Sequence, residues 1–299
     1  MLKVENVSKK YGDVLAVDNL SFQVNDGCIF GLLGLNGAGK TTTFRMILGL
    51  IDDYTGNITI DGEHINYTIS DKLGFLTEER SLLTKLTVLE QIVYYGVLKS
   101  IPENKIEKKL DYWLEKFGIS EYKNRKIKEL SKGNQQKVQF ISAIINEPKL
   151  LILDEPFSGL DPINVELFKS VILELKEKGT SIIFSSHRME HVELFCEELV
   201  VLVKGKSVLQ GKLSEIKKNY KKKNLIVKGD IDKNKILECD GVLKIEKVKD
   251  EYVISIKDES YVNKLFKLIS KYDNIMKFSV EDPSLNEIFI SIVGDKYEA

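Results

Sequence analysis

The sequence has few cysteines and no long apolar run, and each absence argues against a class of protein. Its three cysteines, Cys28, Cys196 and Cys239, are odd in number and far apart, so we expect no disulfide framework and a reducing compartment. No stretch of about 18 apolar residues occurs, which argues against a membrane-spanning helix. The segment Met1–Val7 alternates like a strand, so no secretory signal is expected.

An excess of charge of one sign is also absent. Lysine and arginine number 44 and acidic residues 45, so the net charge is −1 and the basic footprint of a nucleic-acid-binding protein is missing. We therefore expect no nucleic-acid partner. Apolar residues make up 43%, as in an ordinary globular protein, and 299 residues have room for about two domains.

The most informative pattern present is the stretch Gly34–Thr42, which fits G-x-x-x-x-G-K-[ST] with Lys40 and Thr41 as its last two positions. An apolar run precedes it and a run with helical spacing follows. The alternative is a glycine-rich turn that fits the pattern by chance, and the matching strand and helix on its two sides argue against it. The glycines let backbone N–H groups turn inward at a helix N-terminus, where Lys40 reaches phosphates and the Thr41 hydroxyl ligates Mg²⁺. The expected nucleotide-binding residues are Asn36, Gly37, Ala38, Gly39, Lys40, Thr41 and Thr42.

Two carboxylates follow the apolar run Leu150–Leu153. Asp154 and Glu155 would lie at the carboxyl end of a buried strand, where α/β sheets place functional groups. Phosphoryl transfer needs one group for the metal and one for the nucleophile, and we assign Asp154 to Mg²⁺ and Glu155 to the attacking water. An acidic turn after a strand is the alternative. Beside a phosphate loop, however, the pair indicates nucleoside triphosphate hydrolysis.

The periodicities predict an α/β domain followed by a smaller one. Short strands are expected over residues 2–33, with separate strands at 15–17 and 20–24, and helical spacing over residues 78–145 predicts a helical insertion. A strand–helix–strand unit over residues 150–185 indicates a parallel sheet. We place the first domain at 1–216, a lysine-rich linker at 217–223 and an α+β domain at 224–299.

Further motifs occur in a fixed order, and they carry a family resemblance. The sequence reads LSKGN at Leu130–Asn134, SGLD at Ser158–Asp161 and SH at Ser186–His187, and Tyr11 lies in the first predicted strand pair. With the phosphate loop and the two carboxylates, they make residues 1 to about 215 resemble the nucleotide-binding subunit of an ABC transporter. The resemblance implies a P-loop NTPase fold with an antiparallel β subdomain and a helical subdomain.

The resemblance also implies a head-to-tail dimer with composite ATP sites. Tyr11 would stack on the adenine. Ser131 and Gly133 of one subunit would contact the γ-phosphate held by the other, and Asp161 would communicate across the dimer. The second subunit would be another copy or a close relative.

Catalysis is assigned in the same way. Lys40, Glu155 and His187 would be the catalytic residues, with His187 holding the γ-phosphate and orienting Glu155 and the water. His187 and His191 are also spaced as a metal pair, but no third ligand is near, so His191 is expected to be a surface helix residue. His64 is likewise expected at the surface, and the cysteines as small buried hydrophobes.

The sequence departs from the common family pattern at three positions. Lys132 and Asn134 replace the usual glycine and glutamine of the signature loop. Glu78 stands where a glutamine usually binds Mg²⁺ and touches the membrane partner, so we include it with Thr41 and Asp154 among the expected metal and nucleotide ligands. The string Gly74–Leu82 resembles exporter ATPases for sodium, peptides or antibiotics.

The C-terminal segment Asp282–Ile290 resembles the accessory domain of the same exporters, with an expected role in dimer contact or regulation. The prediction is therefore an ATP-hydrolysing motor of an ABC exporter at the cytoplasmic face of the membrane. It would dock through its helical insertion on an integral-membrane permease of a separate chain. A soluble ABC ATPase acting on nucleic acid or the ribosome, and a non-catalytic nucleotide-binding partner, are the alternatives. One cassette without sustained heptads argues against the first, and the intact catalytic residues argue against the second.

Overall fold

A computed structural model describes residues 1–65, 67–79 and 81–297. The chain forms two compact units, Met1–Gln210 and Gly211–Ala299. Arg80, which belongs to the exporter-like string identified in the sequence, lies outside the described residues. In the described part of the chain, no helix has the length and apolar character needed to cross a membrane.

The division between the units differs from the expected boundary at residue 216. Residues expected in the linker belong instead to regular elements of the second unit, helix α7 (Leu213–Asn219) and strand β11 (Lys223–Lys228). Lys223 is buried and binds the Asp282 carboxylate at 2.7 Å. The last lysine of the run therefore begins a strand, where its ammonium pairs with Asp282.

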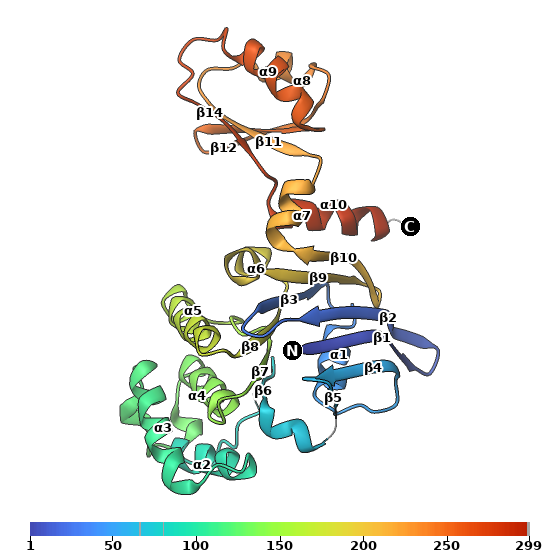
Figure 1. Ribbon diagram of the computed structural model, residues 1–299. Helices are drawn as coiled ribbons and strands as arrows, with labels where there is room; N and C mark the ends of the chain where they lie inside the picture. The colour runs from blue at the N-terminus through green and yellow to red at the C-terminus, as the bar shows by residue number, and fades with distance from the viewer. Residues whose placement is uncertain (66, 80, 298–299) are drawn as a thin grey trace. The chain divides into compact units, whose positions relative to one another are not determined.

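A six-stranded sheet forms the centre of the first unit (Figure 1). Its strand order is β10-β9-β3-β8-β7-β6, and β6, β7, β8, β3 and β9 run parallel. Every residue of β3, β7 and β8 is buried, as expected for apolar strands covered on both faces. The strands are β3 (Ile29–Gly34), β6 (Leu73–Leu76), β7 (Leu150–Asp154), β8 (Ser181–Ser186), β9 (Glu198–Val203) and β10 (Lys206–Lys212).

A second, antiparallel sheet packs against the first through a shared apolar core. It has the order β2-β1-β4-β5, with β1 (Leu2–Tyr11), β2 (Val14–Val24), β4 (Thr55–Ile60) and β5 (Glu63–His64). The two strands expected between residues 15 and 24 are a single strand, β2. Phe22 of this sheet stacks on Phe30 of β3 with ring centroids 5.1 Å apart, and helix α1 (Lys40–Ile47) contributes to the same core.

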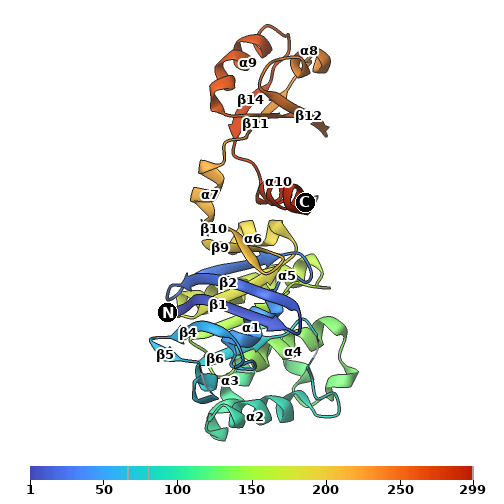
Figure 2. The ribbon, with the colours of Figure 1, turned by 90° about the vertical axis from the view of Figure 1, so that its right-hand side faces the viewer.

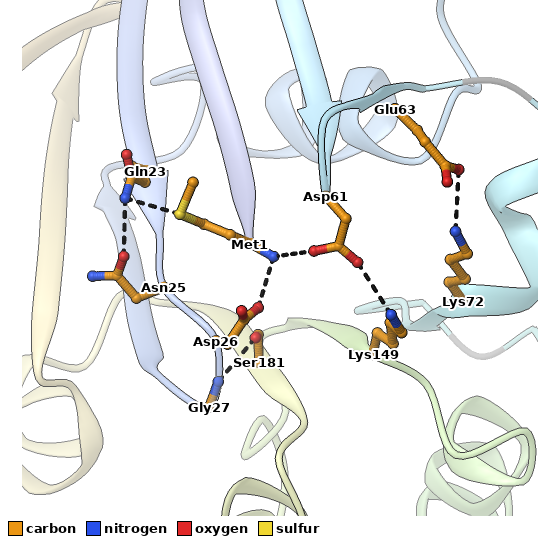
Figure 3. A network of polar contacts seen from close by, with 10 residues as sticks. All are labelled: Met1, Gln23, Asn25, Asp26, Gly27, Asp61, Glu63, Lys72, Lys149 and Ser181. Atoms are coloured by element: carbon orange, nitrogen blue, oxygen red, sulfur yellow. Dashed lines mark hydrogen bonds and ion pairs between the residues drawn. The ribbon is translucent and has the colours of Figure 1, made fainter.

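A polar network joins the two sheets at the amino ends of β7 and β8 (Figure 3). The α-amino group of Met1 binds Asp26 and Asp61, and Lys149 binds the other oxygen of Asp61 at 3.2 Å. The Gly27 N–H donates to the Ser181 hydroxyl at 3.1 Å. These contacts anchor the antiparallel sheet at the edge opposite the phosphate loop.

The expected helical insertion consists of α2 (Val88–Leu98), α3 (Glu103–Lys116) and α4 (Lys132–Ile144), which lie together beside the β6 edge (Figures 1 and 2). Helix α5 (Pro162–Glu177) follows β7, and α6 (Met189–Phe195) follows β8. Rings of Phe117, Phe140 and Phe168 meet edge to face and join α3, α4 and α5. The 3₁₀ helices are η1 (Tyr67–Lys72), η2 (Ser120–Tyr122), η3 (Ile127–Glu129) and η4 (Glu259–Tyr261).

Polar contacts also connect α3 to α5. The Glu174 carboxylate binds Lys116, Lys178 and the Tyr112 hydroxyl, and these bonds outweigh partial burial and lower its pKa to about 2. The Lys178 ammonium also lies 5.5 Å from the ring centroid of Trp113, which is itself buried in α3. The insertion is therefore attached to α5 by both apolar rings and charges.

The second unit is a four-stranded antiparallel sheet of order β12-β13-β11-β14. Side chains of Ile236, Leu265 and Ile269 from α8 and α9 pack on one face, against Leu225 and Ile254. The expected strands and the last two helices are present, whereas the short α8 was not expected. The remaining bounds are α8 (Lys233–Leu237), β12 (Val242–Val248), β13 (Glu251–Ile256), α9 (Val262–Ile269), β14 (Lys277–Glu281) and α10 (Leu285–Tyr297).

Two expectations about burial were wrong, those for His191 and Cys239. His191 is only 7% exposed, because α6 turns its ring against Phe157 with centroids 4.9 Å apart, and burial lowers its pKa. His64 is exposed, and Cys28 and Cys196 are buried as expected, whereas Cys239 is half-buried. Burial, with a contribution from Glu197, raises the pKa of Cys28 to about 12.

Gly74 brings β6 into direct backbone contact with α4. A Cβ at this position would lie 2.2 Å from the Ala143 carbonyl oxygen and 2.9 Å from side chains of Leu151 and Pro148. Only glycine fits this approach, so the edge strand and the helix are packed without intervening side chains.

We predict that Gly74→Ala lowers the free energy of unfolding of the first unit by about 1–3 kcal/mol, because the added methyl group overpacks this contact. Calorimetry would show a lower unfolding midpoint. Gly133→Ala, in helix α4 on the other side of this contact, is the matched control, because a Cβ at Gly133 would come no closer than 3.9 Å to Asn164. The control should keep or raise the midpoint. Equal midpoints for wild type and Gly74→Ala would contradict the prediction.

Candidate active site

The phosphate loop connects the end of β3 to the start of α1. Gly39 is the N-cap residue with φ 104°, and Gly34 has φ 152°, values that favour glycine. A Cβ at Gly34 would lie 2.5 Å from the Leu202 carbonyl oxygen, and one at Gly39 2.5 Å from that of Ala16. Both glycines are therefore required by backbone conformation and by close packing, and the loop opens onto the N-terminus of α1.

Lys40 lies across this loop. Its buried ammonium donates to the carbonyl oxygens of Gly34 at 2.7 Å and Leu35 at 3.1 Å. Burial lowers its pKa, and the carboxylates of Glu155 and Asp154 act in the opposite direction. The lysine thus presents a charge at the mouth of the loop, within the field of two carboxylates.

A cavity of about 310 Å³ surrounds these groups. It is lined by Ala16, Asn36, Gly37, Gly39, Lys40, Thr41, Thr42, Glu78, Asp154 and Glu155. All except Ala16 are residues that the sequence predicted for the site. The structure therefore brings together the phosphate loop, both carboxylates of β7 and the unusual Glu78 from the segment after β6.

Asp154 is held in place by a residue that sequence reasoning missed. The Ser185 hydroxyl donates to Asp154 Oδ1 at 2.6 Å and accepts the Glu155 N–H at 3.1 Å. The Thr41 hydroxyl lies 3.5 Å from Asp154 Oδ2. Ser185 pairs with Asp154 in the register of β7 and β8. The predicted parallel pairing of these strands was the signal that could have identified it.

Glu155 lies in the cavity beside the phosphate loop and contacts His187. It is buried, with φ 51°, and its Oε1 lies 2.9 Å from Nδ1 of the exposed His187. Burial raises the pKa of Glu155, and the bond from His187 acts against that rise. A carboxylate with a raised pKa that remains close to phosphate-binding groups can accept a proton from water.

Tyr11, expected to stack on adenine, and the residues expected to act across a dimer lie elsewhere. In the described chain, Tyr11, Ser131, Gly133 and Asp161 do not line the cavity. Tyr11, at the end of β1, is 46% exposed. Ser131 is the N-cap residue of α4 and accepts the Asn134 N–H at 3.3 Å, with Gly133 in the same turn.

Ala38 and Asp161 have structural surroundings of their own. Ala38, within the phosphate loop, is buried rather than open to the cavity. Asp161 is the N-cap residue of α5, and hydrogen bonds from Asn164 lower its pKa. Since Asn164 Nδ2 also lies 3.9 Å from the Cβ position of Gly133, the first turns of α4 and α5 are neighbours.

The donor set of the cavity fits Mg²⁺. The Thr41 hydroxyl and the carboxylates of Asp154 and Glu78 supply the oxygen ligands that this ion prefers. Among the described residues, no group of three or more His, Cys, Asp or Glu side chains is arranged as a metal site by itself. A magnesium ion here would therefore share its coordination sphere with phosphate oxygens and water.

Comparison with known proteins gives the family. A family model described as ABC transporter matches residues 17–158, and one described as ATP-binding protein DrrA1-3-like, C-terminal domain, matches residues 211–293. The uncharacterized ABC transporter ATP-binding protein YhaQ of Bacillus subtilis is 50% identical over all of both chains. The chain belongs to the ABC transporter ATP-binding proteins.

Two further similarities extend the description of this ABC transporter ATP-binding subunit. The lipopolysaccharide export system ATP-binding protein LptB of Haemophilus influenzae is 35% identical over 71% of the subunit and 90% of LptB. A solved dimeric structure of a bacterial ABC transporter cassette is 26% identical with a TM-score of 0.65, covering 71% of the subunit and 99% of the cassette. The P-loop NTPase fold of the ABC type, predicted from the motifs, is confirmed.

We predict that Glu155→Gln stabilises the subunit at neutral pH and that the gain disappears as the pH falls toward 4.5, the ordinary value for glutamate. The pKa of Glu155 is higher in the folded chain than in the unfolded chain, so the folded chain keeps the carboxyl proton to a higher pH. The free energy of unfolding therefore falls as the pH rises from the unfolded pKa through the folded pKa. Denaturant unfolding at a series of pH values measures the effect.

Glu174→Gln is the control of opposite sign. The pKa of Glu174 is lowered to about 2, so its ionised form stabilises the folded chain above the unfolded pKa and this contribution is lost in acid. Its replacement should therefore destabilise the chain at neutral pH. A neutral-pH loss of stability in Glu155→Gln would contradict the burial argument.

Proposed function

We propose that this subunit is the ATP-hydrolysing motor of an ABC exporter. In this proposal it works as a head-to-tail dimer docked on integral-membrane permease subunits of separate chains, at the cytoplasmic face of the membrane. Membership of the family implies ATP hydrolysis. The observation that carries the catalytic part is Glu155, a buried carboxylate with a raised pKa that shares a cavity with the phosphate loop and contacts His187.

The cavity residues divide the chemistry among them. The loop N–H groups and Lys40 bind the phosphates of ATP, while Thr41 and Asp154 hold Mg²⁺, with Ser185 orienting Asp154. Bound Mg²⁺ neutralises the negative charge that develops on the phosphate oxygens. Glu78 is a further ligand in this proposal, in place of the usual glutamine.

Glu155 takes the proton of the attacking water. Its raised pKa favours acceptance of that proton, and the 2.9 Å contact with His187 orients the carboxylate. The exposed His187 remains free to turn its other ring nitrogen toward the γ-phosphate. Together, the two side chains place the nucleophile and hold the group that it attacks.

A second subunit would complete the site. Ser131 and Gly133 lie at the N-terminus of a 13-residue helix, which favours anions. They do not line the cavity of their own chain as far as the structure describes it, so their proposed phosphate is one held by a partner. The dimeric structure of a similar cassette supports the formation of a dimer. Tyr11 would stack on adenine at the exposed end of β1, and Asp161 would lie at the dimer contact.

A second cavity is the proposed docking place for the permease. Its volume is about 280 Å³, and its wall contains Leu50, Phe75, Leu82, Tyr95 and Gln139. It lies where α2 and α4 of the helical insertion meet β6 and the end of α1, and apolar walls of this kind fit a short helix of a partner protein. The direction of transport is proposed from the export-system relative.

The prediction for catalysis concerns Glu155→Gln. We expect ATP turnover to fall by about 10²–10⁴-fold, because the proton acceptor is lost, while ATP binding is retained and the dimer accumulates in its closed form. Glu166→Gln, on the exposed surface of α5, should keep wild-type turnover. Steady-state phosphate release and nucleotide binding measure the two properties. Normal turnover by Glu155→Gln would refute its role as the base.

The prediction for assembly concerns concentration. We expect the ATPase rate per subunit to fall on dilution through the dimer dissociation range, because a monomer has no partner subunit to supply Ser131 and Gly133 to its ATP site. Sedimentation at the same concentrations identifies monomer and dimer. A constant rate per subunit in a confirmed monomer would show that the composite site is wrong, while leaving Glu155 as the base.

A further inference from the structure

The segment Thr77–Glu79 brings Glu78 into the ATP cavity, and a single side chain of α4 holds it. The Gln139 amide nitrogen lies 3.2 Å from the Thr77 carbonyl oxygen, 3.0 Å from the Thr77 hydroxyl and 3.1 Å from the Glu79 carbonyl oxygen. The Thr77 hydroxyl in turn donates to the Glu79 carbonyl. These contacts flank Glu78 on both sides in the sequence.

The orientation of the Gln139 amide follows from its partners. Carbonyl oxygens are acceptors only, so the group between them must be the –NH₂ end of the amide. Gln139 is also buried, with 6% of its surface exposed, so its contacts with Thr77 and Glu79 are not chance contacts of a surface side chain. A buried amide whose two N–H groups are shared among three nearby oxygens restrains the backbone of residues 77–79.

Helix α4, which carries Gln139, is itself packed closely against β6. The helix contacts β6 through the Gly74 backbone, and β6 leads directly into Thr77. Three residues before Gln139, the Gln136 amide donates to the Pro156 carbonyl oxygen at 2.9 Å, next to Glu155. One helix therefore contacts the backbone beside both Glu78 and the proposed base.

Gln139 also belongs to the wall of the second cavity. Gln139 thus lines the second cavity, and its amide contacts the residues on either side of Glu78, which lines the ATP cavity.

We propose that Gln139 is a positioning residue that holds Glu78 in the ATP cavity as a ligand of the magnesium–nucleotide complex. This inference rests on the proposed function, in which Glu78 is such a ligand. Loss of the amide removes the donor to the Thr77 carbonyl and leaves the Glu79 carbonyl with the Thr77 hydroxyl alone, so the segment becomes more mobile and Glu78 is less often in place. A hydrogen bond of ordinary net strength corresponds to an effect of about three- to tenfold.

The first test measures the segment itself, without nucleotide. In Gln139→Met, which keeps the length and packing of the side chain, amide hydrogen exchange should accelerate about three- to tenfold in peptides that contain residues 77–79. Asn146→Leu is the matched control, because the Asn146 amide donates to the carbonyls of Asp71 and Leu73 at the other end of β6. It should accelerate exchange near residues 71–73 alone. Gln139→Ala serves the same test if Gln139→Met does not fold.

The second test is a double-mutant cycle on nucleotide binding, which does not require hydrolysis. The Mg²⁺ concentration for half-maximal binding of a fluorescent ATP analogue should rise about three- to tenfold in Gln139→Met. It should also rise in Glu78→Ala, and no further in the double variant, because both act through one ligand. Asn146→Leu should match wild type.

The outcomes separate the inference from its basis. Additive effects of the two substitutions, or unchanged exchange at residues 77–79 in both Gln139 variants, would overturn the positioning role and leave Glu78 as a ligand. A silent Glu78→Ala would overturn the ligand role in the proposed function, and with it the purpose of the restraint. Faster exchange with a non-additive cycle supports the proposal.

Discussion

The parallel register of the central sheet is the constraint on which the site depends. Strands β6, β7, β8 and β3 run in one direction, so their carboxyl ends meet at the same edge. Gly34, Asp154, Ser185 and Leu76 stand at or beside those ends. Because a slip of one residue would turn every side chain to the other face, the apolar runs that bury these strands also place the polar groups of the cavity.

This placement concentrates negative charge. Glu78, Asp154 and Glu155 share a cavity with the ammonium of Lys40, and burial works against the ionised form of Glu155. Like charges in a partly buried site destabilise one another, and a cation relieves the repulsion. In the proposed function, Glu78 makes the site depend more strongly on a bound cation, because a carboxylate stands where the family usually has a neutral amide.

The sequence predicts a residue's role when that role is set by its neighbours in the chain. It does not when the role is set by residues that are distant in the sequence and close in space. Gly34–Thr42 was predictable because its chemistry lies in consecutive residues. Ser185 and Gln139 were missed because each acts through a partner distant in the sequence. His191 was misplaced because a seven-residue helix carries too little periodicity to show which side faces Phe157. Ser131 and Gly133 were recognised by resemblance alone, and in the described chain they do not line the cavity of the phosphate loop.

The contact between Trp113 and Lys178 has a spectroscopic consequence. The sequence contains one tryptophan, and it lies in the helical insertion against a cation carried by the end of α5. Tryptophan emission of the unlabelled chain, excited selectively over tyrosine, therefore originates at the contact between the insertion and α5. Since the indole is buried and a nearby ammonium perturbs its excited state, any rotation of the insertion during the ATP cycle would alter tryptophan fluorescence at a single, known place.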